Sequence, residues 1–283
     1  MSSKPLNKKY FSSTIRSITF TIFFLVVSMP LFSQEITEKN YLKLDSALWI
    51  QYEQDMEKIS KDFTNYPEKK DSLQKVSEYI FEVTSKKNRE LAIQYASVPS
   101  GLQRIFMTRL RIPKNTLDSV LKSLPDEIKN SQYAKNIQYH IESKQLEEGD
   151  KYQDMVLKTD EGKDFKLSSL QGKDILFIYG GLDCMGVAGR KYLNTLYSKT
   201  SRDNFEIVMY CLNTDLNHLS KVRETYPCDF ILVSDFLQDG SPVKIVYGTQ
   251  ATPTCFIVDK GGIIKMKTVG LHVDKINELG IGN

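Results

Sequence analysis

The sequence predicts an α/β fold, with a mixed sheet flanked by helices, preceded by an all-helical domain. Two observations predict it. Up to about residue 148, apolar residues recur every three or four positions, which is typical of amphipathic helices. After residue 149 short apolar runs alternate with helical segments, and the chain ends in a hairpin pattern. Strand–helix–strand–helix followed by a hairpin is the element order of a sheet with parallel and antiparallel parts.

Residues 1–33 predict a cleaved secretory signal peptide. Four basic residues and no acidic residue precede or flank the apolar run ITFTIFFLVV. The run is too short for a comfortable bilayer span of about 20 residues, and Ser33 supplies a small residue before the expected cleavage point. We therefore expect export to the periplasm or cell envelope, with membrane attachment only if the signal stays uncleaved.

The charge and the metal-ligating residues exclude several classes of protein. The formal net charge is +3, and the four basic residues of the predicted signal account for it. The remaining chain lacks the basic stripe of a nucleic-acid-binding domain. Four cysteines and three scattered histidines show neither the spacing of a zinc site nor that of a disulfide scaffold. The sequence predicts no nucleic-acid partner, no metal and no other cofactor.

Residues 34–148 are predicted to form the helical domain. Pro67 and Pro113 interrupt the apolar pattern, and Ser100 is expected to cap the third helix. The apolar stripes are predicted to form the domain's own core, since no residue argues for a partner groove. The first stripe consists of Leu48, Tyr52, Met56, Ile59 and Phe63.

Residues 149–283 are predicted to form the sheet domain. The run DILFIYG has the continuous apolar character of a strand that is buried on both faces. Two hairpins are expected, with turns at Asp160–Gly162 and Lys260–Gly262. We expect a first hairpin over 154–167 and a second hairpin over 252–270. Between them, strands over 174–180, 205–213 and 230–234 are expected to alternate with helices over 185–200 and 215–226.

A candidate site lies in LFIYGGLDCMGVAGRKYL, where a glycine turn joins a strand to a helix. A phosphate-binding loop would need lysine and a hydroxyl residue after Gly186, but Val187 and Ala188 follow. The glycines do not fit the dinucleotide fingerprint either. Cys184 remains, because a helix start favours the reactive thiolate. Cys184 is therefore either a reactive thiol or a small residue that fills a tight turn.

Several separate motifs of residues 150–283 resemble one family. LKTDEGKDFKLSSLQGKDILFIYGGLDC, FEIVMYCLNTD and GTQATPTCFIVDKGGII are similar to the TlpA-like (AhpC/TSA-related) thiol:disulfide interchange proteins, which have a thioredoxin-like fold. The resemblance implies a cis peptide bond at Thr252–Pro253 and binding of the substrate's extended chain beside that loop. It also implies that the substrates are thiols or disulfides of proteins or peptides, or small thiols.

The resemblance does not extend to the redox motif itself. The family motif is W-C-x-x-C, but this chain has D-C-M-G-V, so that Asp183 replaces the tryptophan and Val187 the resolving cysteine. Exchange passes through a mixed disulfide that a second thiol must release. Cys211, near the end of the next strand, is the possible resolving thiol within the chain. Cys228 and Cys255 are expected to be structural.

Two functions remain open on these residues. One is an envelope thiol:disulfide oxidoreductase that acts at most as a monothiol through Cys184. The other is a thioredoxin-fold module that binds peptides and has lost redox activity. A peroxidase of the peroxiredoxin type is disfavoured, because its motif proline and threonine are replaced by Phe177 and Gly181.

Overall fold

The computed structural model describes residues 35–280, so the predicted signal peptide lies outside the described residues. Among the described residues, contacts join residues 36–280 into one compact unit, and the division into two domains at residue 148 stays a prediction. Within 35–280, no helix combines the length and the apolar character that crossing a lipid bilayer requires.

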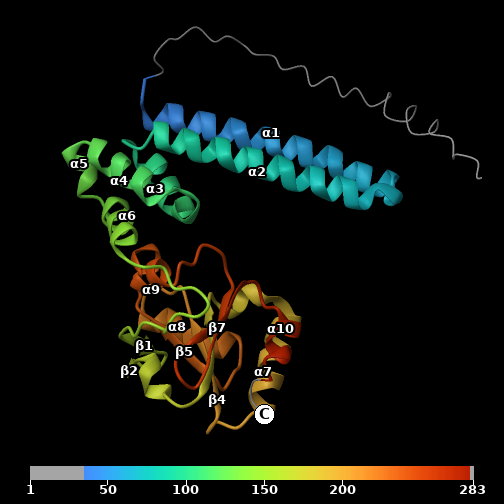
Figure 1. The fold of residues 1–283 in the computed structure, drawn as a ribbon, viewed down its shortest axis with the longest axis vertical. Coiled ribbons are helices and arrows are strands. Elements are labelled where there is room, and N and C mark those ends of the chain that lie inside the picture. Colours follow the sequence, from blue (N-terminus) through green and yellow to red (C-terminus); the bar gives the residue numbers. More distant parts are fainter. Residues whose placement is uncertain (1–34, 281–283) are drawn as a thin grey trace, which may run out of the picture. The chain divides into compact units, whose positions relative to one another are not determined.

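The first part of this unit is helical, as the apolar periodicity predicts. Its two long helices, α1 and α2, lie side by side, and shorter helices follow (Figure 1). The α-helices are α1 (Glu38–Asn65), α2 (Lys70–Gln94), α3 (Pro99–Thr108), α4 (Lys114–Ser123), α5 (Asp126–Lys129) and α6 (Gln132–Glu142), with 3-10 turns η1 (Pro67–Lys69) and η2 (Arg109–Arg111).

The core of this part comes chiefly from α3, α4 and α6. Leu102, Ile105, Leu117 and Ile137 are buried together there. The predicted stripe on α1 contributes less, because only Ile59 of its five members is buried and the others are half-buried. Two packed helices cannot cover all of an apolar face, so much of this stripe stays partly in contact with water.

The predicted cap of the third helix is wrong. Val98 is the N-cap residue of α3 and Pro99 is its first residue, so Ser100 lies inside the helix. Proline is well suited to that first position, because its missing N–H would have no helical partner. The hydroxyl and the N–H of Ser100 instead donate to the carboxylate of Glu38.

The second part is a seven-stranded mixed sheet, which confirms the predicted fold class. The strand order is β2-β1-β5-β4-β3-β6-β7. Strands β3, β4 and β5 are parallel, and β6 runs antiparallel to β3. The strands are β1 (Leu157–Thr159), β2 (Asp164–Phe165), β3 (Asp174–Tyr179), β4 (Phe205–Tyr210), β5 (Ile231–Ser234), β6 (Thr254–Val258) and β7 (Ile264–Val269).

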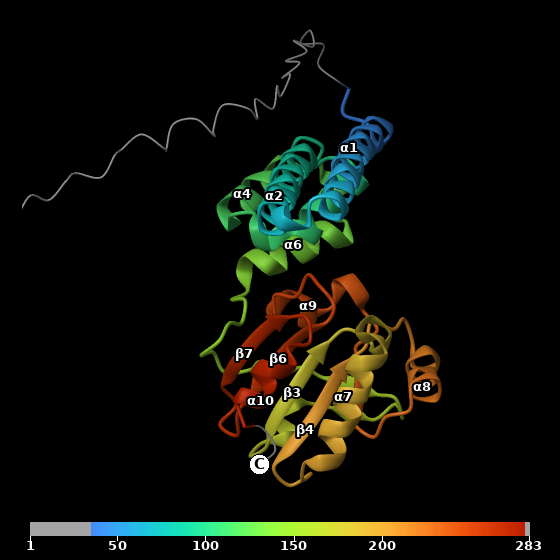
Figure 2. The same cartoon turned by 90° about the vertical axis from the view of Figure 1, so that its right-hand side faces the viewer.

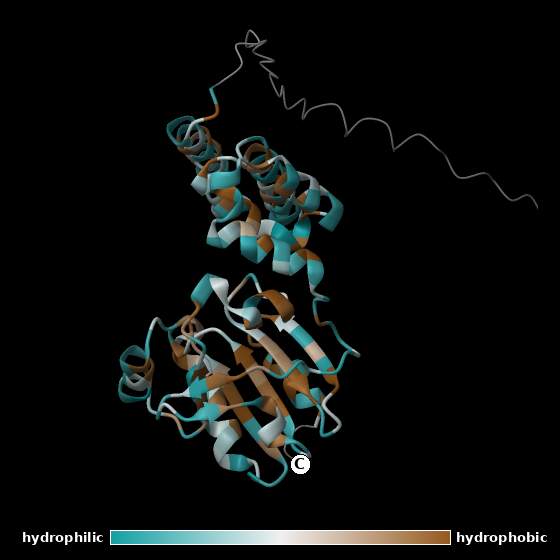
Figure 3. Ribbon diagram, turned by 90° about the vertical axis from the view of Figure 1, so that its left-hand side faces the viewer, coloured by the Kyte–Doolittle hydropathy of each residue, from teal (hydrophilic) through white to brown (hydrophobic). Residues whose placement is uncertain are grey.

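Helices cover both faces of the sheet (Figure 2). Leu176 and Ile178 of β3 pack into a core that also contains residues of α7, α8 and α10. Phe177 and Tyr179 point to the opposite core, which contains residues of α9. The central strands are accordingly apolar on both faces (Figure 3), as the continuous run predicts. These helices are α7 (Gly186–Lys199), α8 (Leu216–Thr225), α9 (Pro242–Val246) and α10 (Val273–Glu278).

Both predicted hairpins are present. Strand β1 pairs with β2 around a turn that contains Gly162, and β6 pairs with β7 around a turn that contains Gly262. Both glycines have positive φ values, of 81° and 86°. Glycine adopts this conformation without the steric cost that other residues meet, so the turns lie where the glycines allow them.

Candidate thiol site

Cys184 lies in a short 3-10 turn, η4 (Leu182–Met185), between β3 and α7. The sequence predicts that the helix begins at Met185, but α7 begins at Gly186, whose φ of 62° separates the turn from the helix. The N–H of Cys184 donates to the carbonyl of Gly181 over 3.3 Å. The cysteine is exposed at the carboxyl end of a central strand, where functional groups of such sheets gather.

The glycine before this turn lies against the proline loop, by which we mean residues 251–253. Gly180 has a φ of 124°, and a Cβ placed on it would lie 2.9 Å from the Cβ of Thr252. The Thr252–Pro253 peptide bond is cis, which confirms the prediction. The backbone of the loop can approach the thiol turn this closely only because residue 180 has no side chain.

Cys184 and Cys211 line the same cavity, which has a volume of about 320 Å³. We call it the thiol cavity. Asp183, Asn213, His218 and Lys221 also line it, and the buried Oδ1 of Asn213 has no hydrogen-bond partner. The structure thus brings together the proposed thiol and the possible resolving thiol.

His218 is a site residue that the sequence did not predict. It lies on α8, where its N–H donates to the side chain of Asp215 over 2.9 Å. Its Nδ1 lies 2.6 Å from Oδ2 of the same carboxylate. The sequence signal was weak, since an aspartate followed three residues later by histidine at a helix start is also an ordinary capping pattern.

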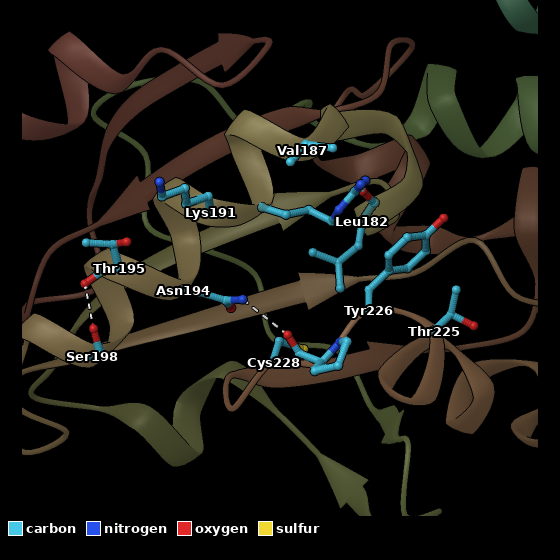
Figure 4. Close-up of a pocket in the computed structure, with 11 residues that line it drawn as sticks. Leu182, Val187, Lys191, Asn194, Thr195, Ser198, Thr225, Tyr226 and Cys228 are labelled. Atoms are coloured by element: carbon cyan, nitrogen blue, oxygen red, sulfur yellow. Dashed lines mark hydrogen bonds between the residues drawn. The ribbon is translucent and has the colours of Figure 1, made fainter.

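A larger cavity of about 700 Å³ adjoins the thiol cavity, because both are lined by Thr225 and Tyr226 (Figure 4). Among the described residues that line it, Arg190 and Lys191 are cationic and none carries a carboxylate. The Arg190 guanidinium donates to the carbonyl of Leu182 over 3.0 Å and lies 4.6 Å from the centre of the Tyr226 ring. Because these contacts hold Arg190 in place, Lys191 is the cation of this cavity that can move more freely toward a ligand.

Val187, at the position of the resolving cysteine, lies on the first turn of α7. Its side chain is 76% exposed and lines the larger cavity. An exposed valine contributes little to the core, so this position is open to substitution. Nothing in the packing requires an apolar residue there.

The other three cysteines are buried free thiols. Burial raises the pKa of Cys211 well above its usual range, that of Cys228 to about 11 and that of Cys255 to about 12. The Cys211 thiol donates to the carbonyl of Met209, and its N–H donates to the carbonyl of Val233. All three thiols therefore stay protonated near neutral pH.

Iodoacetamide added to the folded protein at about pH 8 is expected to modify Cys184 and to leave the other three cysteines unmodified. The thiolate is the reactive form, and burial both blocks access to the others and keeps them protonated. Peptide mapping by mass spectrometry measures the result. Protein unfolded in urea serves as the control and should be modified at all four cysteines. Labelling of folded Cys211 as fast as Cys184 would contradict this expectation.

The sheet part of this chain is similar to known proteins. The family model described as Redoxin matches residues 147–279. The thiol-disulfide oxidoreductase ResA of Geobacillus thermodenitrificans is 29% identical over 118 residues. That match covers 41% of this chain and 66% of the relative, so it spans slightly less than two thirds of the relative's length.

Two solved structures were also matched. A thiol-disulfide oxidoreductase from Bacteroides fragilis is 19% identical, with a TM-score of 0.41, over 46% of this chain and 99% of the other. The thioredoxin domain of a thiol-disulfide oxidoreductase from Bacteroides vulgatus is 17% identical, with a TM-score of 0.40, over 49% of this chain and 99% of the other.

Proposed function

We propose that the protein is a thiol:disulfide oxidoreductase that acts as a monothiol through Cys184, and the match of residues 147–279 to the Redoxin family model supports this proposal. One observation carries the proposal. Of the four cysteines, all of which lie within the described residues, only Cys184 is exposed. It lines the thiol cavity, and Gly180, four residues before it, lies against Thr252 of the proline loop.

The reaction has two steps. The Cys184 thiolate attacks one sulfur of a substrate disulfide, so that a mixed disulfide forms and the other substrate sulfur leaves as a thiolate. A second thiol then attacks the mixed disulfide and restores Cys184. Since Val187 cannot perform the second attack, we propose that it falls to an external thiol, either of a protein or of a small molecule.

Cys211 is the alternative within the chain. It lines the thiol cavity, but it is 1% exposed and burial holds its pKa well above the usual range. A thiol that is protonated and covered is a poor nucleophile. These properties favour the external thiol over Cys211.

The backbone of Thr252 and Pro253 is the proposed binding surface for the substrate chain. This role is supported by the close packing of Thr252 and Pro253 against Gly180, the glycine that precedes the turn of Cys184. The larger cavity beside Val187 offers room and positive charge for the residues that flank the substrate's disulfide. The predicted signal peptide supports the periplasm or cell envelope as the location.

Trapping of the mixed disulfide tests the proposal. Wild-type protein mixed with a disulfide-linked peptide is expected to gain the mass of one peptide half, and the adduct should map to Cys184. Because no second motif thiol releases the adduct, it should accumulate when no other thiol is present, and added glutathione should release the peptide and restore the free Cys184 thiol. The Cys184→Ser variant is the matched control and should form no adduct.

The same experiment distinguishes the non-catalytic alternative, which the missing motif thiol at Val187 favours. A module that only binds peptides would retain the reduced peptide without forming any covalent adduct. Absence of the adduct in folded wild-type protein would therefore overturn the monothiol proposal.

A further inference from the structure

Arg109 is a fully buried arginine in η2, the turn that follows α3 in the helical part. Its Nη1 donates to the carbonyl of Phe106 over 3.1 Å. Among residues 35–280 no carboxylate forms an ion pair with it, and burial lowers its pKa to about 10. A buried charge is costly unless hydrogen bonds satisfy it, so the remaining partners of this guanidinium are informative.

Those partners lie in the sheet part, one in α9 and the other at a position two residues before the proline loop. Nη2 of Arg109 donates to the carbonyl of Lys244 over 2.9 Å and to that of Thr249 over 3.4 Å. Gln250 supplies a second connection, since its side-chain amide donates to the carbonyl of Met107 over 2.6 Å. Two bridges, one from Arg109 in η2 and one from Met107 near the end of α3, thus hold residues 249 and 250.

Only one residue separates this anchored segment from Thr252. The hydroxyl of Thr254 donates to the carbonyl of Ala251 over 2.7 Å, and the N–H of Gly270 donates to the carbonyl of Pro253 over 2.7 Å. Thr252 in turn packs against Gly180, four residues before Cys184. The contacts therefore run without a break from Arg109 to the thiol turn.

We propose that Arg109 is a positioning residue, through which the helical part holds the proline loop in the conformation that receives a substrate chain. This gives the helical part a role at the thiol site although it contributes no residue to the thiol cavity. The effect on the reaction rests on the proposed function, whereas the effect on the loop does not.

Two rates and one exchange measurement test this inference. Arg109→Met keeps most of the side-chain volume and removes every donor. Its mixed-disulfide formation with a disulfide peptide is expected to slow about tenfold, in line with the loss of charged hydrogen bonds. Alkylation of Cys184 by iodoacetamide, which does not use the loop, should change by less than about twofold. Amide hydrogen exchange over residues 249–256 should quicken about tenfold.

Matched variants separate positioning from general damage. Arg111→Met alters an exposed arginine of the same turn, which pairs with Glu82, and should change none of the three readouts. Gln250→Leu removes the second bridge and should act in the same direction as Arg109→Met. If Arg109→Met does not fold, Gln250→Leu alone tests the inference.

The possible outcomes distinguish a failure of the inference from a failure of the proposed function. Unchanged exchange over residues 249–256 in both Arg109→Met and Gln250→Leu would overturn the inference, and so would an equal loss of peptide reaction and alkylation. If wild-type protein forms no mixed disulfide, the proposed function fails, while the exchange measurement still decides whether Arg109 orders the loop.

Discussion

Val187→Cys is expected to convert this protein into one that reduces insulin disulfides over many turnovers, roughly 100-fold faster than wild type. The new thiol would lie three residues after Cys184, which is the spacing of the two cysteines in the W-C-x-x-C motif that this stretch resembles. A disulfide can form at that spacing, and an intramolecular thiol acts at a high effective concentration. Because Val187 is 76% exposed, the change should cost the fold little. Turbidity of insulin with dithiothreitol measures the gain.

Val187→Ser is the matched control for this gain. It has nearly the shape of the cysteine variant but no thiol, so its rate of insulin reduction should stay equal to that of wild type. The double variant with Cys184→Ser should be inactive, because the attacking thiolate is gone. If Val187→Cys forms the disulfide with Cys184 and still shows no turnover, the monothiol state is not what limits the wild-type protein.

Gly180→Ala is expected to lower the free energy of unfolding by about 2–4 kcal/mol. A φ of 124° is strained for any residue with a side chain. The new Cβ would also lie 2.9 Å from the Cβ of Thr252, so either β3 or the proline loop must move. Urea denaturation measures the loss, and mixed-disulfide formation should slow in the protein that stays folded.

Gly181→Ala is the neighbouring control. Gly181 has an ordinary φ of −76°, and the atom that crowds its added Cβ belongs to the flexible carboxylate of Asp183. The substitution should cost less than about 1 kcal/mol. Equal losses for the two variants would show that the contact between Gly180 and Thr252 is not what matters.

The elements of the sheet part could be predicted because their signals are local. A strand buried on both faces is a continuous apolar run, as in β3, and the hairpin turns follow from single glycines such as Gly162 and Gly262. The first and last residues of an element are harder to predict than the element itself. Helix α3 is capped by Val98 rather than Ser100 because Pro99 occupies its first position. The half-buried stripe on α1 shows the same limit, because periodicity gives the apolar face of a helix but not what covers it.

The residues of the candidate site also fall into those that a local pattern predicts and those that it does not. Cys184, Val187 and the glycine pair lie within one short stretch, so the valine three residues after Cys184 could be read directly from the chain. His218 and Cys211 reach the thiol cavity from other elements, and their proximity to Cys184 depends on how β3, β4 and α8 pack.

The sequence by itself determined the mixed sheet, the thiol at the end of a central strand and the absence of a second cysteine three residues after it, because hydrogen bonding and apolar periodicity act over a few neighbouring residues. Only the tertiary structure decided which thiols are covered, why residue 180 must be glycine and what Arg109 holds. Each of these depends on contacts between residues far apart in the chain, such as Gly180 with Thr252 and Arg109 with Thr249. Such contacts form when whole elements pack, and no local pattern encodes them.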